Sequence, residues 1–528
     1  MNMYRAQFLK FRTVVLFIVV ALLVLSAGPE MCPQAQAASG MDFDILTGMA
    51  RDLSQAPYKS RQELELPKME YAQFHDVMFR PERAVWKKEA LPFQLQFFPV
   101  GWIHKKGVTV YEIANGEVRP MPIDTEMFSH AKDKNGKEIQ LPNAISGFRL
   151  HAQLHPGGSI DEFLVFMGAS YFRALANGMG YGISARGISL NTAHPDGEEF
   201  PNFTSFWVVR PAPGDQSITM YALMDGPSCT GAYHLTVSTG TTTSVVVKTS
   251  LFMRKAVSQL GIAPLTSMFW YGENSYPRPQ DYRPEVHDSD GLLVGDRGGE
   301  WIWRPLLLSP AIRHCSFQTA SLKGFGLLLR DRDFKNYQDL GAHNETRPSL
   351  WVEPLNDWGS GGVHLVEIPT HNEYMDNVVA FWEPGAAAVP GARFDLQYRL
   401  TWFRDDPQLP PLGHVIATRR TSVCTKKDGT VTSSYEAVSN EDLQEFVVDF
   451  SPIKGIPCDE RFKPEIKFEN SSGAELVKSF IVANPETGGW RVFAHLKLKE
   501  KGRPAELNLK LLQDGKVVTE KWNYLLQP

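Results

Sequence analysis

The stretch "RFDLQYRLTWFRDDPQLPPLGH" (393–414) joins an alternating strand pattern to a linker, and it divides the chain in two. Residues 393–404 alternate between apolar and polar side chains, which is typical of a half-buried strand. Residues 405–414 hold three prolines and no apolar periodicity, which indicates a linker. We therefore expect a large domain at 41–405, a proline-rich linker at 406–415 and a smaller domain at 416–528.

Short strand patterns fill both parts of the chain. The segments "SITMYALMD" (217–225) and "TTTSVVVKTSLFMR" (241–254) are typical of the larger part, and such dense short strands favour a β-sandwich. One convincing helix is predicted, at 41–55, from apolar residues at helical spacing. Beyond the linker, hairpins are expected to turn at 484–489 and at Asp514-Gly515, which suits an immunoglobulin-like β-sandwich. The predicted fold class is mainly β.

The N-terminus has the pattern of an export signal. Arg5, Lys10 and Arg12 precede an apolar run at 14–25, and the small-residue sequence "AQA" follows at 35–37. The run is shorter than the roughly 18 to 20 apolar residues that a membrane-spanning helix needs. We expect residues 1–37 to be a cleaved signal peptide.

Composition and charge exclude several classes of protein. The chain has 528 residues, of which 43% are hydrophobic and 21% charged, as in a packed globular protein. Loss of the signal peptide removes three positive charges and one negative charge, so the net charge changes from −5 to −7. A mildly acidic chain is not expected to bind nucleic acid.

Four cysteines remain after the signal peptide: Cys229, Cys315, Cys424 and Cys458. An oxidising compartment permits disulfides, and Cys424 with Cys458 is the favoured pair because both lie in the C-terminal part. Four free thiols remain an open alternative.

Motifs for nucleotides, serine hydrolysis and metal ions fail on spacing. The glycines of "GMGYGISARG" (178–187) do not match a dinucleotide fingerprint, and Ser184 lacks the elbow of a serine hydrolase. Asp288-Ser289-Asp290-Gly291 resembles half a calcium loop, but Leu292 then breaks the ligand pattern. We expect no metal site and no cofactor.

Carboxylates beside aromatic and arginine residues, in an exported β protein, are typical of a surface that binds sugars. Glycosidic bonds are cleaved by a pair of carboxyl groups. Three stretches are rich in carboxylates, at 196–200, 285–306 and 365–377, but composition alone does not identify a catalytic pair.

Several longer segments carry a family resemblance. They include "FMGASYFRA" (166–174), "YGISARGISLNT" (181–192), "YRPEVHDSDGL" (282–292), "RPSLWVEPLNDWG" (347–359) and "VEIPTHNEYMDNVVAFW" (366–382). From Met41 to the C-terminus the chain resembles the osmoregulated periplasmic glucan biosynthesis proteins of the G and D types. "MDFDILTGMARDLSQ" and "HNETRPSLWVEP" are closer to the D type. Arg5 and Arg12 stand apart, unlike the twin arginines typical of D-type signals, so the subtype stays open.

The resemblance implies a fold, a cellular location and binding partners. The expected fold is a large galactose-mutarotase-like β-sandwich followed by a smaller immunoglobulin-like one, in the periplasm. The family is required to make the β-1,2-linked glucose backbone of periplasmic glucans. The implied partners are β-1,2-glucan, the inner-membrane glucan synthase and a second copy of the chain in a homodimer.

The resemblance also implies a reaction, because the family includes inverting endo-β-1,2-glucanases. Their general acid matches Asp376 in "NEYMDN", and their general base matches Asp288 in "EVHDSDG". In an inverting site the two carboxyls stand roughly 6.5 to 9.5 Å apart, with room for water. Asp376 has to hold a proton, for which Glu367 or Glu373 could supply a neighbouring charge. Asp288 has to stay ionised and can act through a chain of waters.

Further residues are candidates for substrate contacts because they are polar or aromatic and lie in the family-like segments. They are Tyr171, Arg173, Arg186, Glu198, Glu199, Trp301, Trp303 and Arg304. A structural role is the alternative for the last three: the tryptophans share one face of a strand and fit a core, and Arg304 could pair with Glu300. Two other functions also remain open, a glucan-binding assembly protein without catalysis and a transferase that adds branches.

Overall fold

The computed structural model describes residues 40–130, 132, 136–275, 278–406, 409–425, 438–470, 473–500 and 503–526. The expected signal peptide at 1–37 lies outside these ranges. The chain is mainly β and consists of several sheets, so the predicted fold class is confirmed. No helix in the described part is long and apolar enough to span a bilayer.

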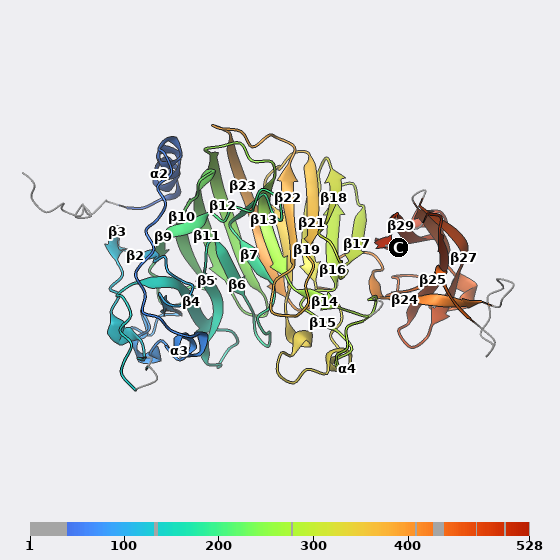
Figure 1. The fold of residues 1–528 in the computed structure, drawn as a ribbon, viewed down its shortest axis with the longest axis horizontal. Coiled ribbons are helices and arrows are strands. Elements are labelled where there is room, and N and C mark those ends of the chain that lie inside the picture. Colours follow the sequence, from blue (N-terminus) through green and yellow to red (C-terminus); the bar gives the residue numbers. More distant parts are fainter. Residues whose placement is uncertain are drawn as a thin grey trace, which may run out of the picture.

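Two large sheets make up most of the molecule (Figure 1). One has ten described strands, in the order β1 (Phe93–Pro99), β4 (Ile145–Gln153), β5 (Ile160–Met167), β6 (Tyr171–Ala174), β7 (Ser184–Arg186), β13 (Leu260–Ser267), β22 (Val378–Pro384), β21 (Gly361–Glu367) and β18 (Arg313–Thr319), with β8 (Ile188–Leu190) paired to β13. The other has fifteen, in the order β26 (Glu465–Asn470), β29 (Ala505–Gln513), β31 (Lys521–Leu526), β17 (Trp301–Pro305), β16 (Gly291–Asp296), β19 (Leu322–Leu328), β20 (Ser349–Pro354), β23 (Arg393–Phe403), β12 (Thr243–Met253), β11 (Cys229–Ser238), β10 (Ser217–Asp225), β9 (Asn202–Val209), β2 (Thr109–Ala114) and β3 (Glu117–Pro120), with β30 (Lys516–Val517) beside β29.

The main core lies between these two sheets. Strands of both contribute fully buried side chains to one cluster, for example Leu95 and Phe148 from one sheet and Leu235 and Val247 from the other. The predicted helix is present as α2 (Phe43–Gln55), and Asp42 caps it by accepting a hydrogen bond from the N–H of Ile45 at 2.8 Å. It packs against the outer face of β10, β11 and β12.

The C-terminal part forms a second sandwich at one end of the molecule (Figure 1). One layer is a four-stranded sheet in the order β24 (Val415–Thr425), β25 (Val438–Phe450), β28 (Gly489–Leu498) and β27 (Ala474–Asn484). The other layer is β26, β29 and β31. The expected hairpin turns are present, between Asn484 and Gly489 and at Asp514-Gly515.

The two sandwiches share a sheet. Strand β31 pairs in parallel with β17, so that Trp303 lies beside Trp522 and Ile302 beside Lys521. A parallel pair between strands so distant in sequence brings Trp301 and Trp303 into the core of the C-terminal part. The sequence predicted a linker between two domains. The chain between β23 and β24 connects the two parts, and the fifteen-stranded sheet runs through both by way of the pair of β17 and β31.

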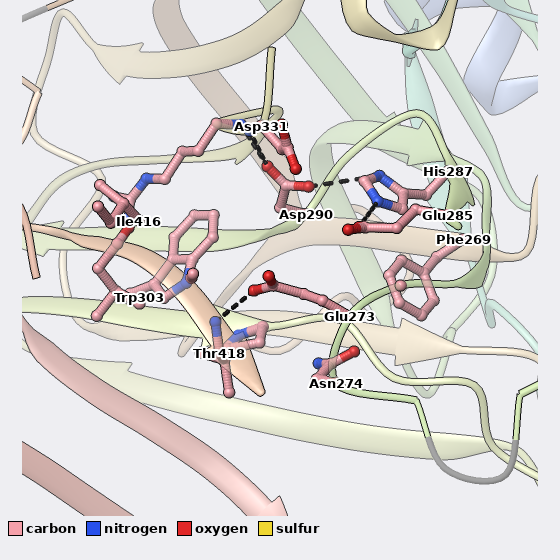
Figure 2. A pocket seen from close by; sticks show the side chains of 15 residues that line it. Phe269, Glu273, Asn274, Glu285, His287, Asp290, Trp303, Asp331, Ile416 and Thr418 are labelled. Carbon is pink, nitrogen blue, oxygen red and sulfur yellow. Dashed lines mark hydrogen bonds and ion pairs between the residues drawn. The ribbon is translucent and has the colours of Figure 1, made fainter. Parts of the chain in front are cut away.

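Buried charged groups also join the two parts. Arg330 contacts both carboxylate oxygens of Glu520, at 2.6 and 3.0 Å, and stacks 3.6 Å from the ring centre of Trp303. Glu520 is fully buried and also accepts the N–H of Val415 at 2.8 Å. Figure 2 shows the small cavity beside this pair, where Glu273 reaches across to accept the N–H of Thr418.

The prediction of a disulfide between Cys424 and Cys458 is corrected at Cys458. Cys229, Cys315 and Cys458 are free thiols, and the thiol of Cys458 donates to the carbonyl of Gly489 at 3.1 Å. The favoured bridge is therefore absent at its Cys458 end, where the thiol faces a backbone carbonyl. The side chain of Cys424 lies outside the described residues.

Glu520→Gln is expected to lower the free energy of unfolding by about 3 kcal/mol, because it leaves Arg330 buried without its counter-charge. Urea unfolding measures this. The exposed pair of Glu500 and Arg503 provides the control, and Glu500→Gln should change stability by less than about 0.5 kcal/mol. Equal effects of the two substitutions would contradict the role assigned to Glu520.

The burial of Glu273 leads us to expect that the free energy of unfolding depends on pH. Burial raises the pKa of Glu273 to about 8, and Arg419 opposes this shift. The folded state therefore binds this proton more tightly than the unfolded state, so the stabilisation is complete below pH 4.5 and is lost as the pH rises toward 8. The free energy of unfolding of the wild type should fall between pH 5 and 8, and in Glu273→Gln this fall should be smaller by on the order of 2 kcal/mol. Parallel pH curves for the two proteins, measured by urea unfolding, would overturn this assignment.

Candidate functional site

Asp376 stands at the end of the loop between β21 and β22, and its neighbour Asn377 fixes the base of that loop. The buried Asn377 amide accepts the N–H of Phe269 at 2.9 Å and donates to the carbonyl of Phe269 at 2.9 Å. It also donates to the carbonyl of Ile368 at 3.0 Å. Both ends of the loop are thus attached to the chain that follows β13.

Asp288 is attached to the same segment from the other side. It follows β15 (Val286–His287), which pairs with β14 (Phe269–Tyr271) so that His287 lies opposite Phe269. The N–H of Asp288 donates to the carbonyl of Met268 at 2.8 Å. The two predicted catalytic aspartates are therefore both anchored to residues 268–269, although they are far apart in sequence.

Asp376 borders a hollow of about 190 Å³. Its carboxylate is partly exposed and pairs with the guanidinium of Arg173 at 3.0 Å. The Nε of Arg173 donates to the hydroxyl of Ser184 on the neighbouring strand β7, which holds the arginine in place. Tyr171 lines the same hollow. The structure thus brings three predicted site residues together.

Asp288 is 4% exposed and forms an ion pair with Arg347. Arg347 follows the short helix η3 (Asn344–Thr346), whose Asn344 donates to the carbonyl of His287. Burial lowers the pKa of Arg347, while the charges of Glu373 and Asp376 raise it. This guanidinium therefore lies within the electrostatic range of both Asp376 and Asp288.

The glycine-rich stretch at 178–187 makes room for this arginine. A Cβ atom on Gly182 would lie 3.0 Å from the Cβ of Arg347, closer than side chains normally approach. The N–H of Gly180 donates to the carbonyl of Thr346. The stretch that failed as a nucleotide motif thus packs against η3 and Arg347.

Arg186 and Glu198 form an ion pair next to Tyr171, which lines the hollow. Arg186 is 2% exposed, pairs with Glu198 at 2.7 Å and lies 4.9 Å from the ring centre of Tyr171. Burial raises the pKa of Tyr171, and the neighbouring charges of Arg186, Glu198, Asp376 and Arg173 also act on it. Glu199 points elsewhere, since its carboxylate accepts the N–H and the hydroxyl of Ser228.

The structure corrects three of the predicted substrate contacts, because it buries Trp301, Trp303 and Arg304. Both tryptophans are 3% exposed and belong to the core shared with the C-terminal part. Arg304 is fully buried and donates to Asn523 and to Glu506, whereas Glu300 pairs with Lys521. These side chains cannot face a sugar beside Asp376, because the β17–β31 pairing encloses them.

The two carboxylates expected to act on Asp376 have other partners. Glu367 is 1% exposed and accepts the N–H of Leu307 at 2.7 Å. Glu373 pairs with Arg283 at 2.8 Å. Arg283 compensates the charge of Glu373, whereas the second carboxylate oxygen of Glu367 is buried without a hydrogen-bond partner.

Sequence reasoning missed Arg347, Asn377 and the exposed residues of the loop. Tyr374 is 87% exposed and Met375 63%, directly before Asp376, and Phe200 is 44% exposed against Arg186. Exposed aromatic rings beside carboxylates are suited to stack on the apolar faces of sugar rings. The signal for the loop residues was available, since "NEYMDN" holds both the acid and the aromatic residue.

Acidic groups also gather in the cavity of Figure 2, where His287 lies 2.9 Å from Glu285 and 3.4 Å from Asp290. Within the described ranges, no group of three His, Cys, Asp or Glu side chains is arranged to hold a metal ion. The groups beside Asp376 are carboxylates, guanidinium groups and aromatic rings, which are the kinds of group that bind and protonate sugars.

Comparison with known proteins gives one family. Residues 41–526 match the family model described as "Periplasmic glucan biosynthesis protein, MdoG". "Glucans biosynthesis protein G" of Ralstonia nicotianae is 39% identical over 509 residues, which cover 96% of this chain and 99% of that protein. The proteins of the same name from Pseudomonas putida strain KT2440 and Rhodopseudomonas palustris are 38% and 37% identical, over 91% and 96% of this chain and 86% and 98% of their own lengths. The chain therefore belongs to the family of periplasmic glucan biosynthesis proteins.

Proposed function

We propose that the chain is an inverting endo-β-1,2-glucanase that cleaves the linear β-1,2-glucan backbone during periplasmic glucan biosynthesis. The observation that supports the proposal is that Asp288 and Asn377, the neighbour of Asp376, are attached to the same short segment. Asp376 also borders a hollow, and the exposed Tyr374 lies two residues before it. Two carboxyl groups are the minimum that glycoside hydrolysis by inversion requires.

In the proposed reaction Asp376 donates a proton to the glycosidic oxygen as the bond from that oxygen to C1 breaks. A water molecule attacks C1 from the opposite face and gives its proton to Asp288, so that the configuration at C1 inverts. Asp376 is partly exposed and can reach the sugar, whereas Asp288 is 4% exposed. The burial of Asp288 fits a base that receives the proton through a chain of waters.

The arginines position these groups. The ion pair between Arg173 and Asp376 has to open before Asp376 can carry a proton, and the released guanidinium can then donate to a sugar hydroxyl. Arg347 stabilises the negative charge of Asp288 in a site that water reaches poorly. Arg173 and Arg347 therefore act as positioning residues for the two aspartates.

One observation favours a second function. Both aspartates are ion-paired, an arrangement that suits a protein that only binds glucan. Such a protein would receive the nascent chain from the inner-membrane synthase and would need no protonated carboxyl. A branching transferase would use the same groups and would form new linkages instead of shorter chains.

Asp376→Asn is expected to lower kcat/KM on linear β-1,2-glucan by at least about 100-fold, because the general acid is lost. The assay is the chain length of the glucan over time, with the anomeric configuration of the first products read by NMR. Asp514→Asn, in the exposed turn between β29 and β30, is the matched control and should keep full activity.

Unchanged chain length with the wild-type protein would refute the glucanase, and binding alone would then support the assembly function. An Asp376→Asn variant as active as wild type would refute the assigned acid. Products of retained configuration would refute the inverting mechanism.

Tyr374→Ala is expected to weaken glucan binding about fivefold or more, because a ring that stacks on a sugar contributes roughly 1 kcal/mol or more. Affinity for the glucan is measured with Asp376→Asn as background, so that no substrate is consumed. Tyr71→Ala removes another exposed ring, which packs on Trp102, and serves as the control. Equal affinity of the Tyr374 and Tyr71 variants would show that Tyr374 does not contact sugar.

A further inference from the structure

A tight turn between β1 and β2 exposes two large apolar side chains. The N–H of Gly101 donates to the carbonyl of His104 at 3.1 Å, and the N–H of His104 donates to the carbonyl of Gly101 at 2.8 Å. Trp102 and Ile103 therefore form the tip of a two-residue turn. Trp102 is 39% exposed and Ile103 is 63% exposed.

The backbone of this turn does not suit its residues. Trp102 has a φ of 49°, in the left-handed region that favours glycine because a side chain there crowds the backbone. Burial does not offset this strain, since both residues of the tip are exposed. Strained residues and exposed apolar groups are typical of places where a protein meets a partner. A contact explains Trp102 and Ile103 better than the stability of the turn does.

The turn is fixed from behind by α3 (Tyr71–His75), which lies at the end of the molecule away from the C-terminal part (Figure 1). A Cβ atom on Gly101 would overlap the ring of Phe74, so the turn packs on α3 only because residue 101 is glycine. Tyr71 is 56% exposed, and its ring centre lies 4.9 Å from that of Trp102. Tyr71, Trp102 and Ile103 thus form an apolar patch on a fixed base, which we name the Trp102 tip.

The chain beside the Trp102 tip is basic. Residues 100–107 ("VGWIHKKG") hold two lysines and no acidic residue. Lys105 and Lys106 line a hollow of about 250 Å³, and Ile103 forms part of its wall. An apolar tip and a basic hollow are therefore adjacent.

The charges around this hollow are positive in balance. Arg61 adds a third cationic side chain to the wall, and Glu63 is the one carboxylate among the described residues that line it. Glu63 pairs with Lys105 at 3.5 Å, but both side chains are about half exposed, so the pair is weak. Charges further away than about 8 Å are screened at physiological salt, so the net charge of −7 expected for the exported chain does not decide this contact.

Shape and chemistry together select the kind of partner. The Trp102 tip is the end of a turn and not a groove, so it enters a surface and does not enclose a ligand. Tryptophan and tyrosine beside lysine are typical of the interface of a lipid bilayer, where the rings lie at the level of the headgroups and the lysines contact phosphates. Isoleucine lacks the flat face that stacks on a sugar ring, so a glucan fits the tip less well.

We propose that the Trp102 tip docks on a phospholipid bilayer that contains anionic headgroups. Trp102 and Ile103 enter the headgroup region, and Lys105 and Lys106 contact lipid phosphates. Docking requires no catalysis at Asp376, so the proposal is independent of the glucanase.

The docking surface is close to the candidate site along the chain. Gly168 and Ala169, in the turn between β5 and β6, line the hollow beside the tip, whereas Met167 and Tyr171, on either side of this turn, line the hollow beside Asp376. A chain docked through the Trp102 tip therefore holds the candidate site near the bilayer.

Flotation with lipid vesicles tests the docking. The chain is used without residues 1–37, so that the apolar run at 14–25 cannot itself bind lipid. Vesicles of phosphatidylcholine with phosphatidylglycerol should bind it at least about tenfold more tightly than vesicles of phosphatidylcholine alone, because each lysine near an anionic surface contributes about fivefold. Added salt should weaken this binding.

Trp102→Gly should weaken binding to the mixed vesicles about fivefold or more, because it removes an apolar ring from the interface. It should not unfold the protein, since glycine suits the φ of 49°, and urea unfolding checks this. Lys106→Gln should weaken the same binding about fivefold. The controls are Phe462→Ser and Lys516→Gln, which remove exposed side chains of the same kinds from the C-terminal part and should leave vesicle binding unchanged.

Absence of binding to both kinds of vesicle overturns the proposal. Equal binding to both also overturns it, because the lysines would then contribute nothing. Wild-type binding by Trp102→Gly would show that the tip is not the contact, and Ile103→Ser decides by the same criterion if Trp102→Gly fails to fold. A wild-type dimer that ignores vesicles and dissociates in Trp102→Gly, measured by analytical ultracentrifugation, would assign the tip to a second copy of the chain and overturn the docking.

Discussion

The amide of Asn377 satisfies both backbone groups of Phe269, and the geometry of the candidate site depends on this contact. A side-chain amide here replaces the strand ladder that ends at the β13–β22 pair, and it leaves no buried N–H or carbonyl of Phe269 unpaired. Asp376 directly precedes Asn377 in the chain. Asp288 directly follows β15, the strand in which His287 lies opposite Phe269. Residues next to both aspartates are therefore bonded to the segment at 268–269, which brings the loop of Asp376 and the end of β15 together.

Guanidinium groups set the electrostatics around this segment. Arg173, Arg186 and Arg347 each pair with a carboxylate, and they come from strands β6 and β7 and from the chain after η3. In a partly buried site such pairs are stronger than at the surface, so each fixes the position of a carboxylate. In the proposed function, a sugar that enters the hollow exchanges these ion pairs for hydrogen bonds to its hydroxyls.

The stretch 285–306 contributes to two different parts of the molecule. Its first residues carry Asp288 to the site, while its last residues form β17 and join the C-terminal sheet. Asp290, in between, belongs to the junction, since it accepts the N–H groups of Arg330 and Asp331, and Arg330 pairs with Glu520. The candidate site and the domain junction are therefore built on the same short length of chain.

The sequence by itself determined the local structure: alternation marked the strands, helical spacing marked a helix at 41–55 that forms over 43–55, and the turns at 484–489 and 514–515 were placed by their residues. It also supplied Asp376 and Asp288 through the resemblance of two short segments. Only the tertiary structure decided that Arg347 contacts Asp288, that Arg173 meets Asp376 across 203 residues, and that Trp301 and Trp303 are core. The physical reason is that alternation fixes which face of a strand a side chain is on, whereas the partner of that face depends on which strands pair. A parallel pair such as β17 with β31 leaves no local signal in either strand.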